Sequence, residues 1–191
     1  MGAATISAAN LLLLYPAERA LIGSAVERRR NEFATGRVLL RSLIGRDEPV
    51  LTLISRAPAI PDDVVATLAH DHDVAVAAVA TRASAPSIRS LGIDIETIGA
   101  VEVGAAGVVC RDDESGLDPT MVFVAKEAAY KAWSNSGGGM LDHHDVRIEV
   151  DAANVPQAFR AEIVPTGDVV RGMIIRTSTR WLAIACVDAP R

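Results

Sequence analysis

Two short segments determine how this chain is interpreted: Gly92-Ile93-Asp94-Ile95-Glu96 and Lys126-Glu127-Ala128-Ala129-Tyr130-Lys131. Side chains alternate between the faces of an extended strand, so Asp94 and Glu96 should point the same way, with Cα atoms about 6.5–7 Å apart. In a helix, Glu127 and Lys131 share a face because they are four residues apart. The two segments therefore offer carboxylates and lysines that one strand and one helix can bring together.

These residue types point to phosphate chemistry. Mg²⁺ is usually held by a few hard oxygen ligands that leave room for substrate phosphates, and flanking lysines neutralise phosphate charge. Each segment alone is also typical of a solvated strand face or of a solvated helix face with an i, i+4 pair. Together they favour Mg²⁺-dependent transfer of a phosphate-linked group.

Length and composition indicate one compact enzyme. A chain of 191 residues, half of them hydrophobic, can bury a sizeable core. The formal net charge of −5 argues against nucleic acid as a partner. Cys110 and Cys186 match no paired spacing, so neither a disulfide framework nor a zinc site is expected, and a reducing cytoplasm is the default. The apolar run 11–14 is too brief for a signal peptide or a membrane span.

The charges are distributed unevenly. Residues 1–60 hold 8 Arg and 5 acidic residues, whereas residues 61–191 hold 11 basic and 19 acidic residues. In a helix, Arg30, Arg37 and Arg41 would lie along one stripe, with Arg29 beside its start. This stripe is either a solvated helix face or a phosphate clamp, because guanidinium groups bind phosphate oxygens in a bidentate manner.

The chain resembles the 4′-phosphopantetheinyl transferase superfamily, in its larger two-half class typified by the activators of surfactin and enterobactin synthetases. Residues 92–96 match its motif Gly-Ile/Val-Asp-x-Glu, and its helical motif is matched by Phe123-Val124-Ala125-Lys126-Glu127-Ala128-Ala129-Tyr130-Lys131-Ala132-Trp133, with Val124 where a small polar residue is usual. Two upstream segments are also similar to the family, Arg29-Arg30-Asn31-Glu32-Phe33-Ala34-Thr35-Gly36-Arg37 and Arg56-Ala57-Pro58-Ala59-Ile60-Pro61. His70 falls where the family has a histidine, so the similarity runs from about Glu18 to Trp133.

The resemblance implies the family's α+β fold over residues 1–191 as a single enzyme unit. That fold has two pseudo-symmetric halves, here about 1–100 and 101–191, each a long helix packed on a mainly three-stranded antiparallel sheet. The active site would form in the cleft between them, with Asp94 from one half and Glu127 from the other. Because one chain contains both halves, a monomer is expected.

Hydrophobic periodicity and turn residues predict a compatible order of elements. We expect a helix over about 17–43, strands near 50–55, 74–81 and 91–96, a second helix over about 120–134, and strands near 146–150, 173–177 and 181–187. The run Asn135-Ser136-Gly137-Gly138-Gly139 is a stop signal for the second helix.

The resemblance also implies roles for individual residues. Mg²⁺ would be held against the pyrophosphate of coenzyme A by Asp94, Glu96 and Glu127. Glu127, directly or through a water, would accept the proton of the attacking hydroxyl, and Lys126 and Lys131 would offset charge on the transferring phosphoryl and the leaving group. The 3′-phosphate and adenosine side of coenzyme A would be bound by Arg29, Arg37, Arg56 and His70.

The reaction implied is that of a holo-[acyl-carrier-protein] synthase type of transferase. A serine hydroxyl of an apo acyl or peptidyl carrier protein attacks the β-phosphorus of coenzyme A and receives the 4′-phosphopantetheine arm. Adenosine 3′,5′-bisphosphate is released. The two-half class more often serves polyketide or nonribosomal peptide biosynthesis than fatty-acid synthesis.

The chain departs from the family pattern at three places. Ile60 stands where Trp is usual, Ala69 stands where a hydroxyl residue precedes the histidine, and the stretch between Glu96 and Lys126, which meets the carrier protein in the family, is short. One alternative is therefore a degenerate homologue that binds coenzyme A or a carrier protein without transfer. Two others are a Mg²⁺-dependent phosphoesterase acting on a nucleotide and a purely structural reading of the charged residues.

Three further clusters contain residue types found at functional sites. Four consecutive residues on a turn cannot all face one ion, so in His70-Asp71-His72-Asp73 only His70 keeps a functional prediction. For His143-His144, which precede the strand near 146–150, a structural or surface role is expected. Asp112-Asp113-Glu114 is expected to form a solvated loop edge.

Overall fold

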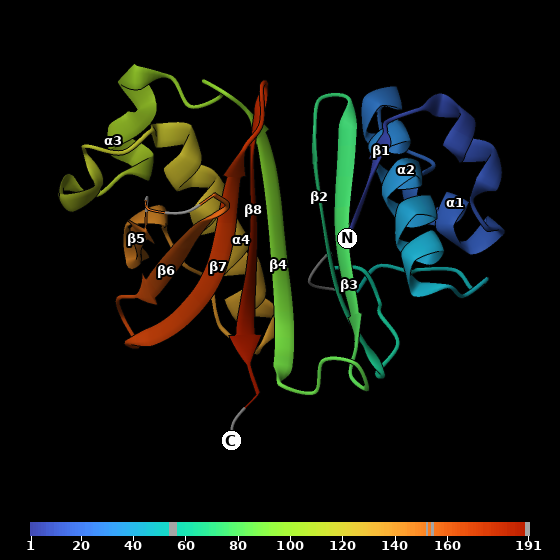
Figure 1. Ribbon diagram of the computed structural model, residues 1–191. Helices are drawn as coiled ribbons and strands as arrows, with labels where there is room; N and C mark the ends of the chain where they lie inside the picture. Colours follow the sequence, from blue (N-terminus) through green and yellow to red (C-terminus); the bar gives the residue numbers. More distant parts are fainter. Residues whose placement is uncertain (54–56, 152, 154, 190–191) are drawn as a thin grey trace. The chain divides into compact units, whose positions relative to one another are not determined.

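A computed structural model of the chain describes residues 1–53, 57–151, 153 and 155–189 (Figure 1). Two compact units are formed along the chain, Met1–Pro86 and Ser87–Arg191. Both are built from one antiparallel sheet and helices, as the α+β prediction requires. No helix in the described ranges is long and apolar enough to cross a membrane.

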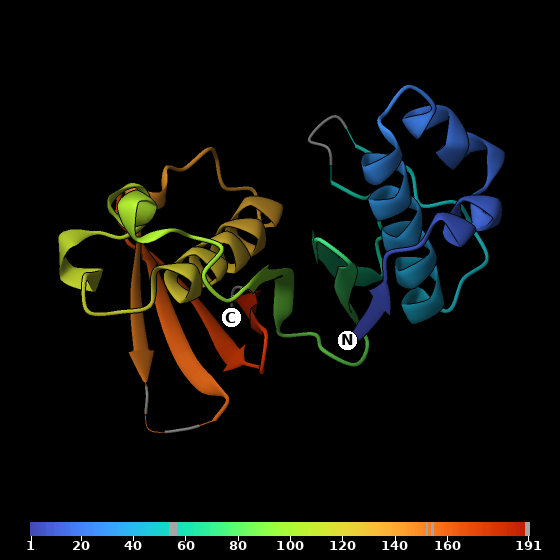
Figure 2. The same ribbon diagram turned by 90° about the horizontal axis from the view of Figure 1, so that it is seen from above.

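The first unit contains a three-stranded antiparallel sheet in the order β1-β3-β2. Its strands are β1 (Gly2–Thr5), β2 (Val64–Asp71) and β3 (Val74–Thr81), and its α-helices are α1 (Pro16–Ile22) and α2 (Glu27–Ile44). Figure 2 shows α2 along one face of this sheet. Apolar residues of α2 such as Leu39 and Leu40 pack with Ala75 and Ala77 of β3, because burying these faces removes apolar surface from water.

The second unit contains a five-stranded antiparallel sheet in the order β4-β8-β7-β6-β5. Its strands are β4 (Ile88–Thr97), β5 (Val146–Asp151), β6 (Gln157–Ile163), β7 (Asp168–Arg176) and β8 (Arg180–Asp188). One face is covered by α4 (Pro119–Asn135), and α3 (Ala106–Val109) lies in the connection between β4 and α4 (Figure 2). Asp118 caps α4 by accepting from the backbone N–H groups of Thr120 and Met121.

The second helix and five of the six predicted strands are confirmed with shifts of a few residues at their ends. The helix predicted over 17–43 is wrong as a single element, because the chain leaves helical geometry between Gly23 and Val26 and thereby separates α1 from α2. Three strands were not predicted, β1, β2 and β6. Near 50–55, Thr52 makes only an isolated bridge to Pro58, and residues 54–56 lie outside the described residues.

The predicted division of the chain near residue 100 is corrected to residues 86 and 87. The reason is β4, which pairs along its length with β8, so that Asp94 lies opposite Ala183. Asp94 therefore belongs to the same unit as Glu127, and the prediction that they come from different halves is wrong. Addition of β4 and β6 also makes the second sheet five-stranded rather than three-stranded.

Candidate active site

The close approach of α4 to β4 places the acidic strand residues. A Cβ atom built on Gly92 would lie 1.9 Å from the carbonyl oxygen of Ala128, so only glycine fits between strand and helix. Side chains two apart on a strand share a face, and Asp94 therefore points toward α4 as Gly92 does. The glycine of the motif is thus explained by packing.

Asp94 meets Lys131 across this contact. The Lys131 Nζ lies 2.5 Å from Asp94 Oδ1 and also donates to the carbonyl oxygen of Ile93 at 3.2 Å. Asp94 is only 6% exposed, and its second oxygen, Oδ2, has no hydrogen-bond partner among the described residues. Burial raises the pKa of Asp94 to about 6; Lys131 opposes this shift and the negative charge of Glu127 adds to it.

Glu127 lies on the turn of α4 that precedes Lys131, and its side chain is 29% exposed. Its Oε1 atom is 3.4 Å from Nε2 of His143. The His143 ring in turn packs against Phe123, with ring centroids 5.4 Å apart. The predicted metal ligand Asp94 and the predicted catalytic residues Glu127 and Lys131 are therefore close together. His143 lies beside Glu127, although its sequence context predicted a structural or surface role.

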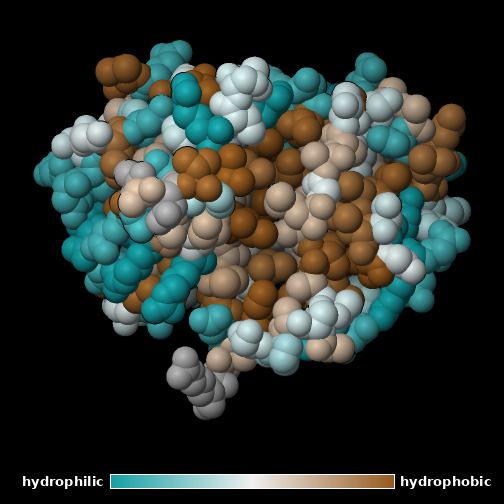
Figure 3. All heavy atoms as spheres, viewed as in Figure 1, coloured by the Kyte–Doolittle hydropathy of each residue, from teal (hydrophilic) through white to brown (hydrophobic). Residues whose placement is uncertain are grey.

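Glu96 lies farther along β4, where it helps to line a pocket of about 530 Å³. The other lining residues are mostly apolar: Ala100, Val101, Glu102, Ala105, Val108, Val109 and Phe123. Figure 3 shows hydrophobic side chains exposed over α3, where Val108 is 68% exposed. The surface over β5 and β6 is hydrophilic instead (Figure 3).

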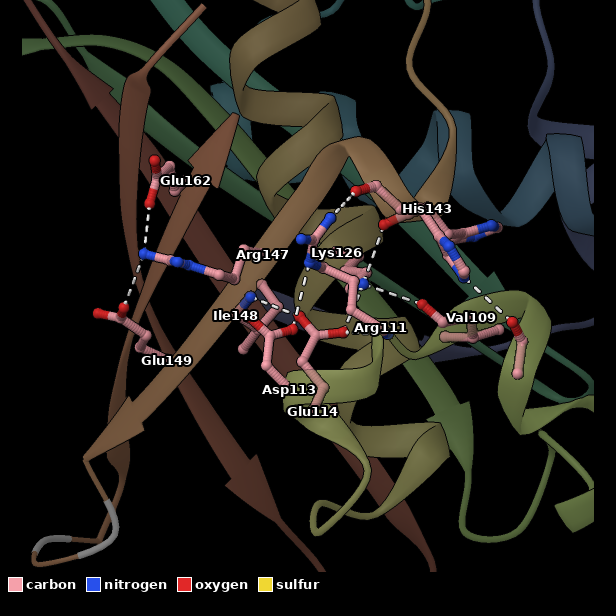
Figure 4. A network of polar contacts seen from close by, with 12 residues as sticks. Val109, Arg111, Asp113, Glu114, Lys126, His143, Arg147, Ile148, Glu149 and Glu162 are labelled. Carbon is pink, nitrogen blue, oxygen red and sulfur yellow. Dashed lines mark hydrogen bonds and ion pairs between the residues drawn. The ribbon is translucent and has the colours of Figure 1, made fainter. Parts of the chain in front are cut away.

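Lys126 does not lie where the sequence predicted it. Its side chain is 1% exposed, and its Nζ lies 2.6 Å from Glu114 Oε2. It also donates to the carbonyl oxygens of Val109 and His143, each at 2.9 Å (Figure 4). Burial lowers the pKa of Lys126, and Glu114 opposes that shift. The structure therefore replaces the predicted phosphate contact of Lys126 with a structural role.

Glu114, the buried partner of Lys126, is a residue that the sequence interpretation missed. It is 1% exposed rather than a solvated loop edge, and it accepts from the backbone N–H groups of Arg111 and Ile148 as well as from Lys126. The first unit contains a similar carboxylate, Glu18, which accepts from the backbone of Tyr15 and Val50 and from Arg41. In both cases a glutamate at the third position of a short helix was the available signal.

The carboxylate oxygens of Asp94 and Glu127 are of the type that hard divalent cations prefer. Among the described residues, however, no group of three or more His, Cys, Asp or Glu side chains is arranged to hold a metal ion. Asp94 Oδ2 is buried without a partner, and Glu127 adds negative charge nearby. A cation would compensate negative charge at Oδ2. In the structure the ammonium of Lys131 compensates it at Oδ1.

In the first unit, Arg29 and His70 form a second polar cluster. Arg29 NH1 lies 2.9 Å from His70 Nε2, and Glu32 lies within ion-pair distance of both side chains. Arg29 comes from α2, and His70 comes from β2 rather than from a turn. Two of the residues predicted to bind coenzyme A are therefore adjacent.

Two arginines of the predicted stripe, Arg37 and Arg41, are enclosed, whereas Arg30 is exposed. Arg37 is 4% exposed, stacks on Phe33 at 4.4 Å and donates to Thr52 Oγ1, while its Nε has no hydrogen-bond partner among the described residues. Burial lowers its pKa to about 10. The side chain of Arg41 pairs with the buried Glu18. Arg37 and Arg41 therefore do not belong to a solvated helix face. Arg56 lies outside the described residues.

Comparison with known proteins gives consistent matches. A family model described as the 4′-phosphopantetheinyl transferase N-terminal domain matches residues 17–80. Svp of Streptomyces mobaraensis, a 4′-phosphopantetheinyl transferase, is 36% identical over 178 residues, which cover 84% of this chain and 70% of that protein. The chain belongs to the 4′-phosphopantetheinyl transferase family.

Two further 4′-phosphopantetheinyl transferases are similar over most of their length. PptT of Mycobacterium tuberculosis is 30% identical over 183 residues, covering 87% of this chain and 79% of that protein. Npt of Nocardia iowensis is 34% identical over 191 residues, covering 90% of this chain and 85% of that protein. In this family member, the N-terminal domain match lies inside the first unit and contains Arg29, Arg37 and His70. The resemblance stated from the motifs is therefore confirmed at the level of the superfamily.

Proposed function

We propose that this protein transfers the 4′-phosphopantetheine arm of coenzyme A to a serine of an apo acyl or peptidyl carrier protein and releases adenosine 3′,5′-bisphosphate. The observation that carries the proposal is the meeting of Asp94, Lys131 and Glu127 between β4 and α4, with Asp94 buried and one of its oxygens unpartnered. Membership of the transferase family supports the same reaction.

We further propose that the reaction needs Mg²⁺, held by Asp94, Glu96 and Glu127. When bound, the cation would polarise the phosphorus under attack and neutralise the pyrophosphate of coenzyme A. The buried Oδ2 of Asp94 supports this assignment because a buried carboxylate oxygen without a partner is costly and a cation would compensate it. Lys131 would then be released from part of its contact with Asp94 and offset charge on the leaving group.

Glu127 is the proposed base. It would accept the serine proton either directly or through a water, as a group within hydrogen-bond reach of the hydroxyl can. Its carboxylate is partly exposed, so a substrate hydroxyl can approach it, whereas the buried Lys126 and Glu114 cannot be approached in this way. Lys126 therefore has no place in the proposed chemistry beyond supporting α4.

The first unit would bind the other end of coenzyme A. Arg29 and His70 would hold the 3′-phosphate, because adjacent guanidinium and imidazole groups offer several donors to one anion. Arg37 and Arg56 are retained as proposed contacts to the adenosine side. The buried Nε of Arg37, with no partner among the described residues, supports an anion near it.

The finer classification is also proposed. Glu18 and Glu114 occupy comparable positions in the two units, each joining the start of a short helix, a later backbone N–H and a cation from the long helix. This correspondence supports two pseudo-symmetric halves and hence the larger class of the family. We expect a cytoplasmic monomer that serves polyketide or nonribosomal peptide biosynthesis.

The test is to mix the purified protein with coenzyme A, Mg²⁺ and a panel of apo carrier proteins and to weigh the carriers by intact mass spectrometry. A gain of about 340 Da that EDTA abolishes would support metal-dependent transfer. Asp94→Asn should lose the gain, whereas Asp188→Asn, an exposed matched control on β8, should keep it. Coenzyme A binding without any mass gain would favour the degenerate homologue.

A further inference from the structure

His143 has no counterpart among the predicted site residues, yet its ring faces Glu127. It begins the short helical turn His143–Asp145 that precedes β5. Its Nε2 lies 3.4 Å from Glu127 Oε1, and this nitrogen is buried and makes no hydrogen bond within the described ranges. A buried imidazole nitrogen without another partner is oriented by whatever it faces, which here is the carboxylate of Glu127.

The ring is held on the helix face that carries Glu127. Phe123 and Glu127 are four residues apart on α4 and therefore lie on one face. The ring of His143 packs on Phe123 with centroids 5.4 Å apart and planes tilted by 36°. This packing limits the rotation of the imidazole and keeps Nε2 near the carboxylate.

The backbone of His143 is held by the residue next to Glu127. The buried Nζ of Lys126 donates to the carbonyl oxygen of His143 at 2.9 Å (Figure 4). The same Nζ pairs with Glu114 at 2.6 Å, and Glu114 accepts from the backbone N–H of Ile148 in β5. One buried ion pair thus links α4 to the start of the turn that carries His143 and to β5, the strand that follows this turn.

We propose that His143 is a positioning residue for Glu127: its Nε2 engages Oε1 and leaves Oε2 of the same carboxylate for the serine proton or the cation. The inference rests on the proposed function, because it assigns a purpose to the orientation of the proposed base. The Lys126–Glu114 pair supports the arrangement by fixing the His143 backbone beside the turn of α4 that carries Glu127.

Three substitutions test the role by activity. His143→Phe keeps a ring against Phe123 but removes the nitrogen, and His143→Gln restores an amide nitrogen close to the position of Nε2. Loss of a group that orients a functional side chain typically costs about 10–100-fold, so we expect His143→Phe to lower kcat about 10-fold or more, with KM for coenzyme A unchanged and with partial rescue in His143→Gln. His144→Phe is the matched control, because the His144 ring contacts the carbonyl oxygen of Gly107 instead. Circular dichroism and thermal unfolding verify that each variant folds.

A second measurement needs no activity. Ring ¹⁵N signals of His143 and His144, recorded by NMR in the wild type and in Glu127→Gln, report the contact directly. We expect the His143 Nε2 signal to move and the His144 signals to stay. Equal kcat values in His143→Phe and His144→Phe, or an unmoved His143 signal, would overturn the inference. If the wild type is active, the proposed function still stands in that case.

An inactive wild type would overturn the proposed function instead. A His143 signal that responds to Glu127→Gln in that protein would show that the two side chains are in contact but do not serve this reaction.

Discussion

Gly92 on β4 and Ala128 on α4 approach so closely that a Cβ atom on Gly92 would meet the carbonyl oxygen of Ala128 at 1.9 Å. The obstructing atom belongs to a helix backbone and cannot rotate away. Two residues further along β4, Asp94 contacts Lys131 of the same helix. The packing of strand on helix and the geometry of the candidate site are therefore one feature.

Gly92→Ala should push α4 away from β4. Overpacking of a well-packed core commonly costs about 1–3 kcal/mol, and we expect a loss of unfolding free energy of about 3 kcal/mol because backbone must move. Urea unfolding followed by circular dichroism measures it. Gly116→Ala is the control, since a Cβ there meets no atom within 4 Å. Equal stability of the two variants would contradict the close approach.

Lys126→Met should destabilise the protein because it leaves Glu114 buried without its cation. Removing one partner of a buried pair costs about 3–5 kcal/mol. Adding Glu114→Gln should recover part of the loss, as a double-mutant cycle by chemical unfolding would show. Arg171→Met removes one partner of an exposed pair with Asp188 and should change stability by less than about 0.5 kcal/mol.

If Lys126 contacted substrate phosphate instead, Lys126→Met would behave differently. The variant would keep the unfolding free energy of the wild type and lose only transfer activity. That outcome would restore the role predicted from the sequence and contradict the buried pair.

The stability of the metal-free protein should depend on pH through Asp94. Its native pKa of about 6 lies above the ordinary value of 3.8, so the folded state binds this proton more tightly than the unfolded state. The stabilising contribution is therefore fully present below pH 3.8 and is lost as the pH rises through 6. A shift of about 2 pKa units corresponds to about 3 kcal/mol.

Asp94→Asn removes this titration. In the presence of EDTA, its unfolding free energy relative to the wild type should be higher at pH 8 than at pH 5 by about 1.4 kcal/mol, because pH 5 lies only about one unit below the native pKa of about 6. Chemical unfolding of both proteins at each pH measures the difference. A difference that does not change with pH would show that Asp94 titrates normally.

Arg29→Gln should weaken coenzyme A binding about 10-fold, which corresponds to about 1.4 kcal/mol, if Arg29 and His70 hold the 3′-phosphate. Isothermal titration calorimetry with coenzyme A and with 3′-dephospho-coenzyme A separates the phosphate from the rest of the ligand. The variant should lose affinity for the first ligand only. Arg30→Gln, one residue along α2, serves as the control.

Ile60→Trp tests a departure from the family pattern. Ile60 lines a pocket of about 180 Å³ together with Ile44, Val50 and Pro61, among others. A larger side chain at this position should fill part of that space and raise the unfolding free energy by about 0.5–2 kcal/mol. A lower melting temperature in the variant would show that the pocket does not accept an indole ring.

Much of the candidate site was predictable because it depends on local geometry. The alternation of a strand places Gly92 and Asp94 on one face, and the period of a helix places Glu127 and Lys131 on another. Apolar periodicity likewise located α4 and most strands of the second unit. Short strands with few apolar residues, such as β1, gave no comparable signal.

The sequence motifs by themselves thus indicated the family, the α+β class and which strand and helix contain the acidic residues. These properties follow from residue types at short spacings. Only the tertiary structure decided to which unit Asp94 belongs, because β4 pairs with β8, a strand that follows more than eighty residues later in the chain. It also decided that Lys126 is buried with Glu114 while Lys131 reaches Asp94. Both lysines lie on one helix, and only the elements packed around that helix determine which ammonium is enclosed and which can reach the site.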